Sequence, residues 1–210
     1  MPVSNDREYR RIDIANIECR DDDNGKIVEG YATVFDNEYL LYNLGDYEVR
    51  ESFDRASFND ADMQDVIMQY DHEGRVFARV SNGTLEVQPD EYGLKIRANL
   101  GGTDIGSQLY QEIKGGYTTK MSIGFTVKSD EQTQERGKDK TIIHRKITGV
   151  KKLYDVSAVS LPANDATEIS ARSLGEGAIA EAEKERLAEM ERQRKIQKIK
   201  ILMEVNKHDD

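Results

Sequence analysis

The first two thirds of the chain alternate between short apolar runs and turn-forming residues. The runs are rich in β-branched and aromatic residues and are bounded by Gly, Pro, Asn or Asp, which is typical of strands. Asn24-Gly25 lies between the first two runs and favours a two-residue hairpin turn. The short connections predict a β-meander. The expected strands are residues 9–19, 27–35, 66–70, 76–80, 84–88, 94–100, 117–127, 141–148 and 152–161.

Two segments follow a helical period instead. Ile105, Leu109 and Ile113 recur every four residues and predict a helix that Gly115-Gly116 ends. Residues 176–205 are dense in Glu, Lys, Arg, Ala and Leu, which are strong helix formers. Apolar positions are sparse there, so a solvated helix that projects from the domain is the favoured interpretation. A partner-binding helix is the alternative.

Polar stretches separate or follow these elements. Residues 51–62 predict a partly helical connection in which Ser57 caps a short helix. Residues 128–140 are almost wholly polar and predict an exposed, mobile loop. Pro162 closes the sheet region, because proline cannot donate into a strand ladder. We therefore predict a domain over residues 1–172 and a charged helical tail over residues 173–210.

Composition and charge exclude several classes of protein. Lys and Arg number 30 and Asp and Glu 40, a net charge of −10, which argues against a general nucleic-acid binder. The single cysteine, Cys19, excludes an intramolecular disulfide framework and a zinc site built from several thiolates. No apolar run approaches the roughly 18 residues that cross a bilayer. The polar N-terminus lacks a secretory signal, so we expect a soluble intracellular protein.

The acidic run Asp21-Asp22-Asp23 invites a calcium interpretation, but its spacing does not fit. A calcium-binding loop with its invariant glycine at Gly25 would place Arg20 at the first position and Tyr31 at the twelfth. Both positions require an acid. A solvated turn is therefore favoured over a metal site.

Ser122 and His72 are the candidates for nucleophilic chemistry. Ser122 lies in an apolar strand, and Gly124 beside it would leave room for a substrate backbone. His72 follows an apolar strand in a polar turn, a suitable place for a base. A serine hydroxyl needs such a base within about 2.6–3.2 Å, and spacing alone does not join residues so far apart. The alternative is a structural serine and a structural histidine. Cys19 is disfavoured as a nucleophile, because the acidic turn beside it would raise the pKa of its thiol.

An ordered set of segments resembles the prohead (capsid maturation) serine proteases of tailed bacteriophages, which are distant relatives of the herpesvirus assemblin proteases. Each segment is a weak signal by itself, and their order and spacing are specific. The likeness runs from about Ile12 to Arg172. The matching segments are residues 30–35, 51–53, 71–73, 93–94, 121–125, 153–157 and 161–164, together with Gly115.

The resemblance implies a serine endopeptidase. Ser122 would be the nucleophile, His72 its base and Asp155 the third member, at a position where the family often carries Glu. His144 is the alternative third member, since the herpesvirus relatives use a second histidine. Arg145 is a candidate to assist backbone N–H groups in stabilising the oxyanion. The strand pattern and the resemblance together predict a mainly β fold with a few α-helices, a closed or nearly closed antiparallel β-barrel followed by a charged C-terminal helix.

The resemblance also implies a setting and partners. The protein would act in the bacterial host cytoplasm, inside the assembling prohead, on scaffolding segments and the major capsid protein, and would cut itself. Residues 163–177, polar and without a strong pattern, would be the region of self-cleavage. A homodimer is possible by resemblance, and no cofactor, metal, nucleic acid or membrane is implied. The alternatives are a non-catalytic scaffold or capsid-associated protein that kept the fold, and a β-barrel binding module with a coiled-coil tail.

Overall fold

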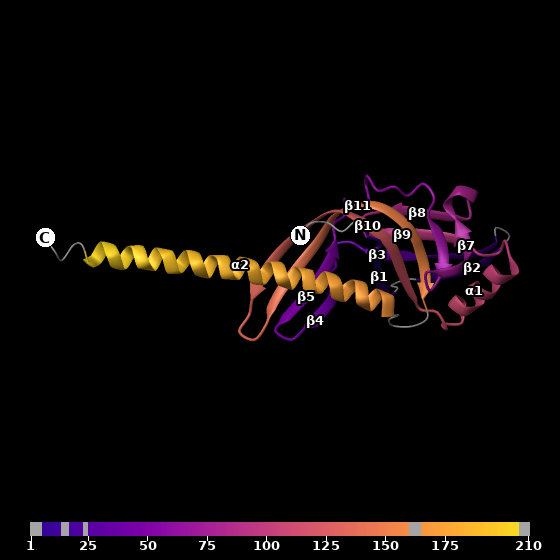
Figure 1. Ribbon diagram of the computed structural model, residues 1–210. Helices are drawn as coiled ribbons and strands as arrows, with labels where there is room; N and C mark the ends of the chain where they lie inside the picture. The colour runs from indigo at the N-terminus through magenta and orange to yellow at the C-terminus, as the bar shows by residue number, and fades with distance from the viewer. Residues whose placement is uncertain (1–5, 14–16, 23–24, 160–164, 206–210) are drawn as a thin grey trace.

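The computed structural model describes residues 6–13, 17–22, 25–159 and 165–205, which form two β-sheets and two α-helices (Figure 1). The larger sheet has seven strands, and β1, β10, β11, β5 and β4 follow one another across it. β6 pairs with β11, and β7 pairs with β6. Its strands are β1 (Glu8–Asp13), β4 (Tyr39–Leu44), β5 (Tyr47–Phe53), β6 (Ile67–Tyr70), β7 (Glu73–Arg79), β10 (Lys120–Arg136) and β11 (Thr141–Val159).

The smaller sheet has four antiparallel strands in the order β2, β3, β9 and β8. They are β2 (Glu18–Asp22), β3 (Gly25–Val34), β8 (Leu85–Pro89) and β9 (Gly93–Asn99), and a short 3₁₀ helix at Val80–Asn82 precedes β8. β2 pairs with β3, which confirms the hairpin predicted around Asn24-Gly25. The predicted strand over residues 9–19 is divided between β1 in one sheet and β2 in the other.

The predicted closed or nearly closed antiparallel barrel is not confirmed, because the described strands do not close into a barrel. β11 pairs with β10 along one edge, and its other edge pairs in parallel first with β5 and then with β6. The chain therefore spreads into an open, mixed sheet. Among the described strands, β1, β4 and β7 each have one partner and end this sheet. The prediction of a mainly β fold with a few helices is confirmed.

The polar stretch 128–140, predicted to be a mobile loop, is the end of a long hairpin instead. β10 continues to Arg136 and β11 begins at Thr141, so that the turn is only a few residues long. Side chains of opposite charge face each other across the hairpin, as at Glu131 and Lys146. The two strands predicted over residues 141–148 and 152–161 form one strand, β11, which continues through Gly149. The register between β10 and β11 shifts near this glycine.

Residues 51–62 differ from the prediction as well. Residues 51–53 belong to β5, and residues 55–60 form turns, with Ser57 buried among them and not at the start of a helix. The hairpin of β4 and β5 was not predicted.

Apolar side chains of both sheets form the core that holds β10 in place. The rings of Phe53 and Phe125 lie 5.3 Å apart, and Phe58 stacks on Phe53. Leu94 and Ile96 of the smaller sheet belong to the same cluster. These side chains are almost fully buried, and each contributes about 1.5–3 kcal/mol on transfer from water. The core therefore fixes the strand that carries Ser122.

Helix α1 (Asp104–Lys114) confirms the predicted helix over residues 105–114. Thr103 caps its start, with the side chain accepting a hydrogen bond from the Gly106 N–H. Leu109 and Ile113 are buried, as their spacing predicts. Gly116, with φ of 75°, takes the left-handed conformation just after the helix.

Helix α2 (Asp165–Val205) begins earlier than predicted. Its Ile179 and Ala182 pack against Val49 and Ile143 of the larger sheet. The side chains of residues 183–198 are all exposed, and Figure 1 shows the helix extending beyond the sheets, as the sequence predicts. None of the described helices is long and apolar enough to span a membrane. The division into residues 1–172 and 173–210 stays a prediction.

A buried cluster of charges ties β1, β5, β10 and β11 together. Arg10 donates hydrogen bonds to Glu51 and, at 2.5 Å, to Glu8. Arg145 donates to Glu51 at 2.8 Å, to Glu8 at 3.0 Å and to Asp130 at 2.5 Å. Burial opposes the ionisation of Glu51, but the charge of Arg10, its hydrogen bond and the charge of Arg145 outweigh burial and lower the pKa of Glu51.

Replacing Glu51 with Gln is expected to lower the free energy of unfolding by about 3–5 kcal/mol, because two buried guanidinium groups lose their shared carboxylate. Urea titration measures this change. Glu86→Gln is the control, since Glu86 forms an exposed pair with Arg97 and should change stability by less than about 1 kcal/mol. The contribution of Glu51 should be lost as the pH falls from its ordinary pKa of 4.5 through the lowered value. Equal effects of the two substitutions would contradict this account of the cluster.

Candidate active site

His72 lies in the two-residue turn that joins β6 to β7. The turn residues Asp71 and His72 have φ of 49° and 60°, so both are left-handed. These angles suit a type I′ turn, which normally favours Asn and Gly. A left-handed backbone costs about 1–3 kcal/mol at each residue that has a side chain. The Asp71 N–H donates to the Ala158 carbonyl at 3.0 Å, which ties the turn to β11.

The pairing of three strands brings Ser122, His72 and Asp155 together. Ser122 in β10 lies opposite Ser157 in β11, two residues from Asp155. β6 runs parallel to β11, with Ile67 beside Asp155, and therefore delivers its terminal turn to the same place. His72 Nε2 lies 2.5 Å from Ser122 Oγ, and His72 Nδ1 lies 2.5 Å from Asp155 Oδ1.

These contacts determine which groups donate. An ionised carboxylate only accepts hydrogen bonds, so the Nδ1–H of His72 donates to Asp155. In the neutral imidazole Nε2 then accepts, and the hydroxyl of Ser122 donates to it. The arrangement can move the serine proton to the imidazole while the carboxylate faces the positive charge that develops.

Asp155 is fully buried, and two further groups surround it. The Ser157 hydroxyl donates to Oδ1 at 2.8 Å. Arg7 Nη2 lies 3.8 Å from Oδ2, and Oδ2 has no hydrogen-bond partner within the described part of the chain. Arg7 also lies over the ring of Tyr154, at 4.0 Å from its centroid.

Strand β1 contributes to the site from the other side of the imidazole. The ring of Tyr9 packs edge-on against His72, with centroids 4.5 Å apart. Sequence reasoning missed Tyr9, Arg7 and Ser157. The two-residue spacing of Asp155 and Ser157 places both on one face of a strand and could have indicated Ser157. Nothing in the sequence around Arg7 and Tyr9 indicated that β1 pairs with β10.

Gly124 has a different role from the predicted one. It was expected to leave room for a substrate backbone, but it lies opposite Asp155. A Cβ atom at this position would overlap Asp155 Oδ2 and lie 3.0 Å from Tyr9 Cε1. The absent side chain thus makes room for the carboxylate.

Gly124→Ala is therefore expected to lower kcat/KM for peptide hydrolysis by about 10²-fold, because it displaces a group that orients His72. Overpacking should also lower the free energy of unfolding by about 1–3 kcal/mol. Hydrolysis of a quenched fluorescent peptide and urea titration measure the two effects. The control is Gly102→Ala, where a Cβ would meet no atom within 4 Å. Full activity of Gly124→Ala would argue against the role assigned to this glycine.

The other candidates lie elsewhere. His144 Nδ1 lies 2.6 Å from Glu38 Oε1, so the structure brings Asp155 and not His144 to His72. Arg145 is engaged in the buried charge cluster, which argues against the predicted assistance to the oxyanion. Burial, and not the described residues of the acidic turn, raises the pKa of the Cys19 thiol, and the charge of Lys114 opposes this shift. Within the described residues no three His, Cys, Asp or Glu side chains converge on a possible metal position.

The paired side chains are shielded from solvent. Ser122 is 1% exposed, and the side chain of His72 is 10% exposed.

Comparison with known proteins identifies the family. The model of the caudovirus prohead serine proteases matches residues 15–179, a range that includes Ser122, His72 and Asp155. No curated protein and no solved structure matches the chain. The distant relationship to the herpesvirus proteases stays a prediction. The family match covers most of the sequence and confirms the resemblance, and the chain belongs to the caudovirus prohead serine proteases.

Proposed function

We propose that this protein is a serine endopeptidase of phage head maturation that acts through Ser122, His72 and Asp155. The family to which the chain belongs supports the general activity, that of a head-maturation protease. The observation that supports the residue assignment is the continuous pair of contacts from Ser122 Oγ through His72 to Asp155, each 2.5 Å long.

The chemistry proceeds in two halves. Ser122 Oγ attacks the scissile carbonyl carbon while His72 Nε2 takes the hydroxyl proton, and an oxyanion forms. The C–N bond then breaks, His72 gives its proton to the leaving amine, and the acyl group remains on Ser122. Water, deprotonated by His72, hydrolyses this ester and restores the hydroxyl. Asp155 holds the imidazole in the required tautomer and stabilises its charged form.

The substrates we propose are the major capsid protein and scaffolding segments, cut inside the assembling prohead in the host cytoplasm. This assignment is supported by the family and not by a feature of the cavity. Co-expression with the capsid protein of the same phage tests it. Wild type and Ser129→Ala, an exposed serine of the same strand, should yield shortened capsid protein, and Ser122→Ala should leave it at full length. Undiminished processing by Ser122→Ala would favour the non-catalytic scaffold protein instead.

We also infer that the protein cuts itself, although the helix alters the expected position. Residues 165–177 belong to α2, and a protease binds its substrate extended, so these peptide bonds must first unwind. Residues 163–164 lie outside the described residues. Intact mass measurement of wild type and Ser122→Ala tests self-processing, since equal full-length masses would exclude it. A homodimer stays a prediction that sedimentation would test.

A further inference from the structure

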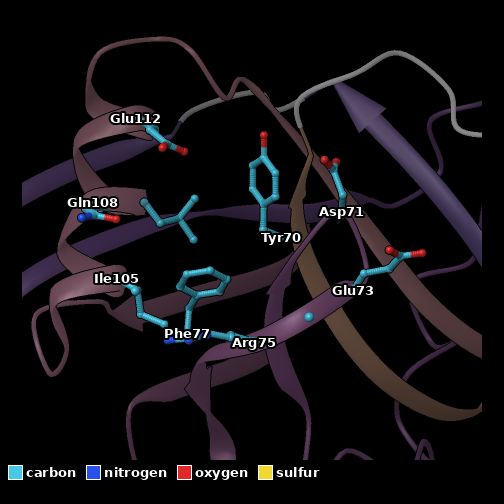
Figure 2. Close-up of a pocket in the computed structure, with 10 residues that line it drawn as sticks. Tyr70, Asp71, Glu73, Arg75, Phe77, Ile105, Gln108 and Glu112 are labelled. Atoms are coloured by element: carbon cyan, nitrogen blue, oxygen red, sulfur yellow. The ribbon is translucent and has the colours of Figure 1, made fainter.

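A cavity of about 590 Å³ lies between the turn of β6 and β7 on one side and α1 on the other. In Figure 2, Tyr70 and Phe77 extend into the space between strands and helix. Glu112 approaches from the helix, and Asp71 and Glu73 stand on the turn side. The cavity thus has an aromatic interior, with Glu112 on the helix side and Asp71 and Glu73 on the side of the turn.

Both walls of this cavity continue into the segments that carry the proposed catalytic pair. Tyr70, Asp71 and Glu73 flank His72 directly. α1 ends at Lys114, and a short connection leads from it to β10 and Ser122. That connection is held to the helix by the N–H of Tyr117, which donates to the Glu112 carbonyl at 2.9 Å. The cavity therefore adjoins the turn that carries His72 and the helix that precedes β10.

The charges around the cavity favour a cation. Its described lining residues include the acids Glu73 and Glu112 on its two sides and the base Arg75. Glu73 and Glu112 have no ion-pair partner within the described part of the chain. The single base, Arg75, lies near Phe77 at the end of the cavity opposite Glu112 in Figure 2.

We propose that this cavity is a subsite for a lysine or arginine side chain of the substrate, close to the scissile bond. The aliphatic stem of such a side chain would pack on Tyr70 and Leu109, and its charged head would meet Glu112. A long stem with a charged end matches an apolar interior with a carboxylate at its margin. The inference rests on the proposed function, since it assigns specificity to the same site.

Internally quenched peptides that differ at one residue near the cleaved bond test this inference. With wild-type protein, kcat/KM should be about tenfold higher or more for a peptide with Lys or Arg than for its norleucine counterpart. Glu112→Gln should remove most of this preference while hydrolysis of the norleucine peptide is retained. Glu112→Lys should shift the preference toward Glu. The control is Glu91→Gln, an exposed acid that does not line the cavity, and it should behave as wild type.

The outcomes separate the inference from the function on which it rests. Hydrolysis that requires Ser122 but shows no preference for Lys or Arg would overturn the subsite and leave the protease intact. An equal loss for basic and neutral peptides in Glu112→Gln would also overturn it. No hydrolysis of any peptide, with no labelling of Ser122 by a fluorophosphonate, would overturn both.

Discussion

Replacement of Ser122 by Ala is expected to lower kcat for peptide hydrolysis by about 10⁵–10⁶-fold. The substitution removes the oxygen that forms the acyl intermediate, and neither His72 nor Asp155 supplies another nucleophile at the same place. Binding interactions remain, so KM should change little, and residual hydrolysis should stay above the rate in water.

The Ser122→Ala measurement needs a folded protein and a matched control. The side chain of Ser122 is buried and small, so its loss should leave the circular dichroism spectrum and the urea midpoint close to those of wild type. Ser129→Ala changes an exposed serine on the same strand and should keep full activity. Hydrolysis by Ser122→Ala at a rate near that of wild type would exclude this serine as the nucleophile.

Asp155→Asn is expected to lower kcat by about 10³–10⁴-fold while the protein stays folded. The amide has nearly the shape of the carboxylate, but it carries no charge and can present an N–H to His72. An imidazole that accepts at Nδ1 holds its proton at Nε2, and it then cannot take the proton of Ser122. The change should therefore appear in kcat and hardly in KM.

Two further variants make the Asp155 result specific. Asp60→Asn changes an exposed carboxylate and should behave as wild type. His144→Ala should also keep wild-type activity, because His144 contacts Glu38 and not His72. Full activity in Asp155→Asn together with a large loss in His144→Ala would reverse the assignment of the third member.

The strands and α1 were largely predictable because burial leaves a local signal. The spacing of Ile105, Leu109 and Ile113 identified α1, and β-branched runs bounded by turns identified β3, β8 and β9. The hairpin over residues 128–140 left no such signal, because most of its side chains are exposed and polar on both faces. Pairing between the two strands specifies this hairpin, and the composition of a single segment does not reveal such pairing.

The arrangement of the sheets could not be predicted from local patterns. Whether β11 closes a barrel or pairs in parallel with β5 and β6 depends on contacts far apart in the chain. The same pairing places His72 beside Ser122, so their proximity was not readable from the sequence either. The positions of Ser122 and His72 in the strand pattern made them candidates, and the resemblance to a family added Asp155. The role of Gly124 differs from the predicted one because its partner, Asp155, lies on the neighbouring strand.

The most direct test of the account is the rate at which a fluorophosphonate labels the protein, with the labelled residue located by mass spectrometry. We expect one modification, on Ser122, in wild type, and a labelling rate lower by several orders of magnitude in His72→Ala, where the hydroxyl has no base. Labelling of another serine, or equal labelling of Ser122 with and without His72, would contradict the claim that this imidazole activates this hydroxyl.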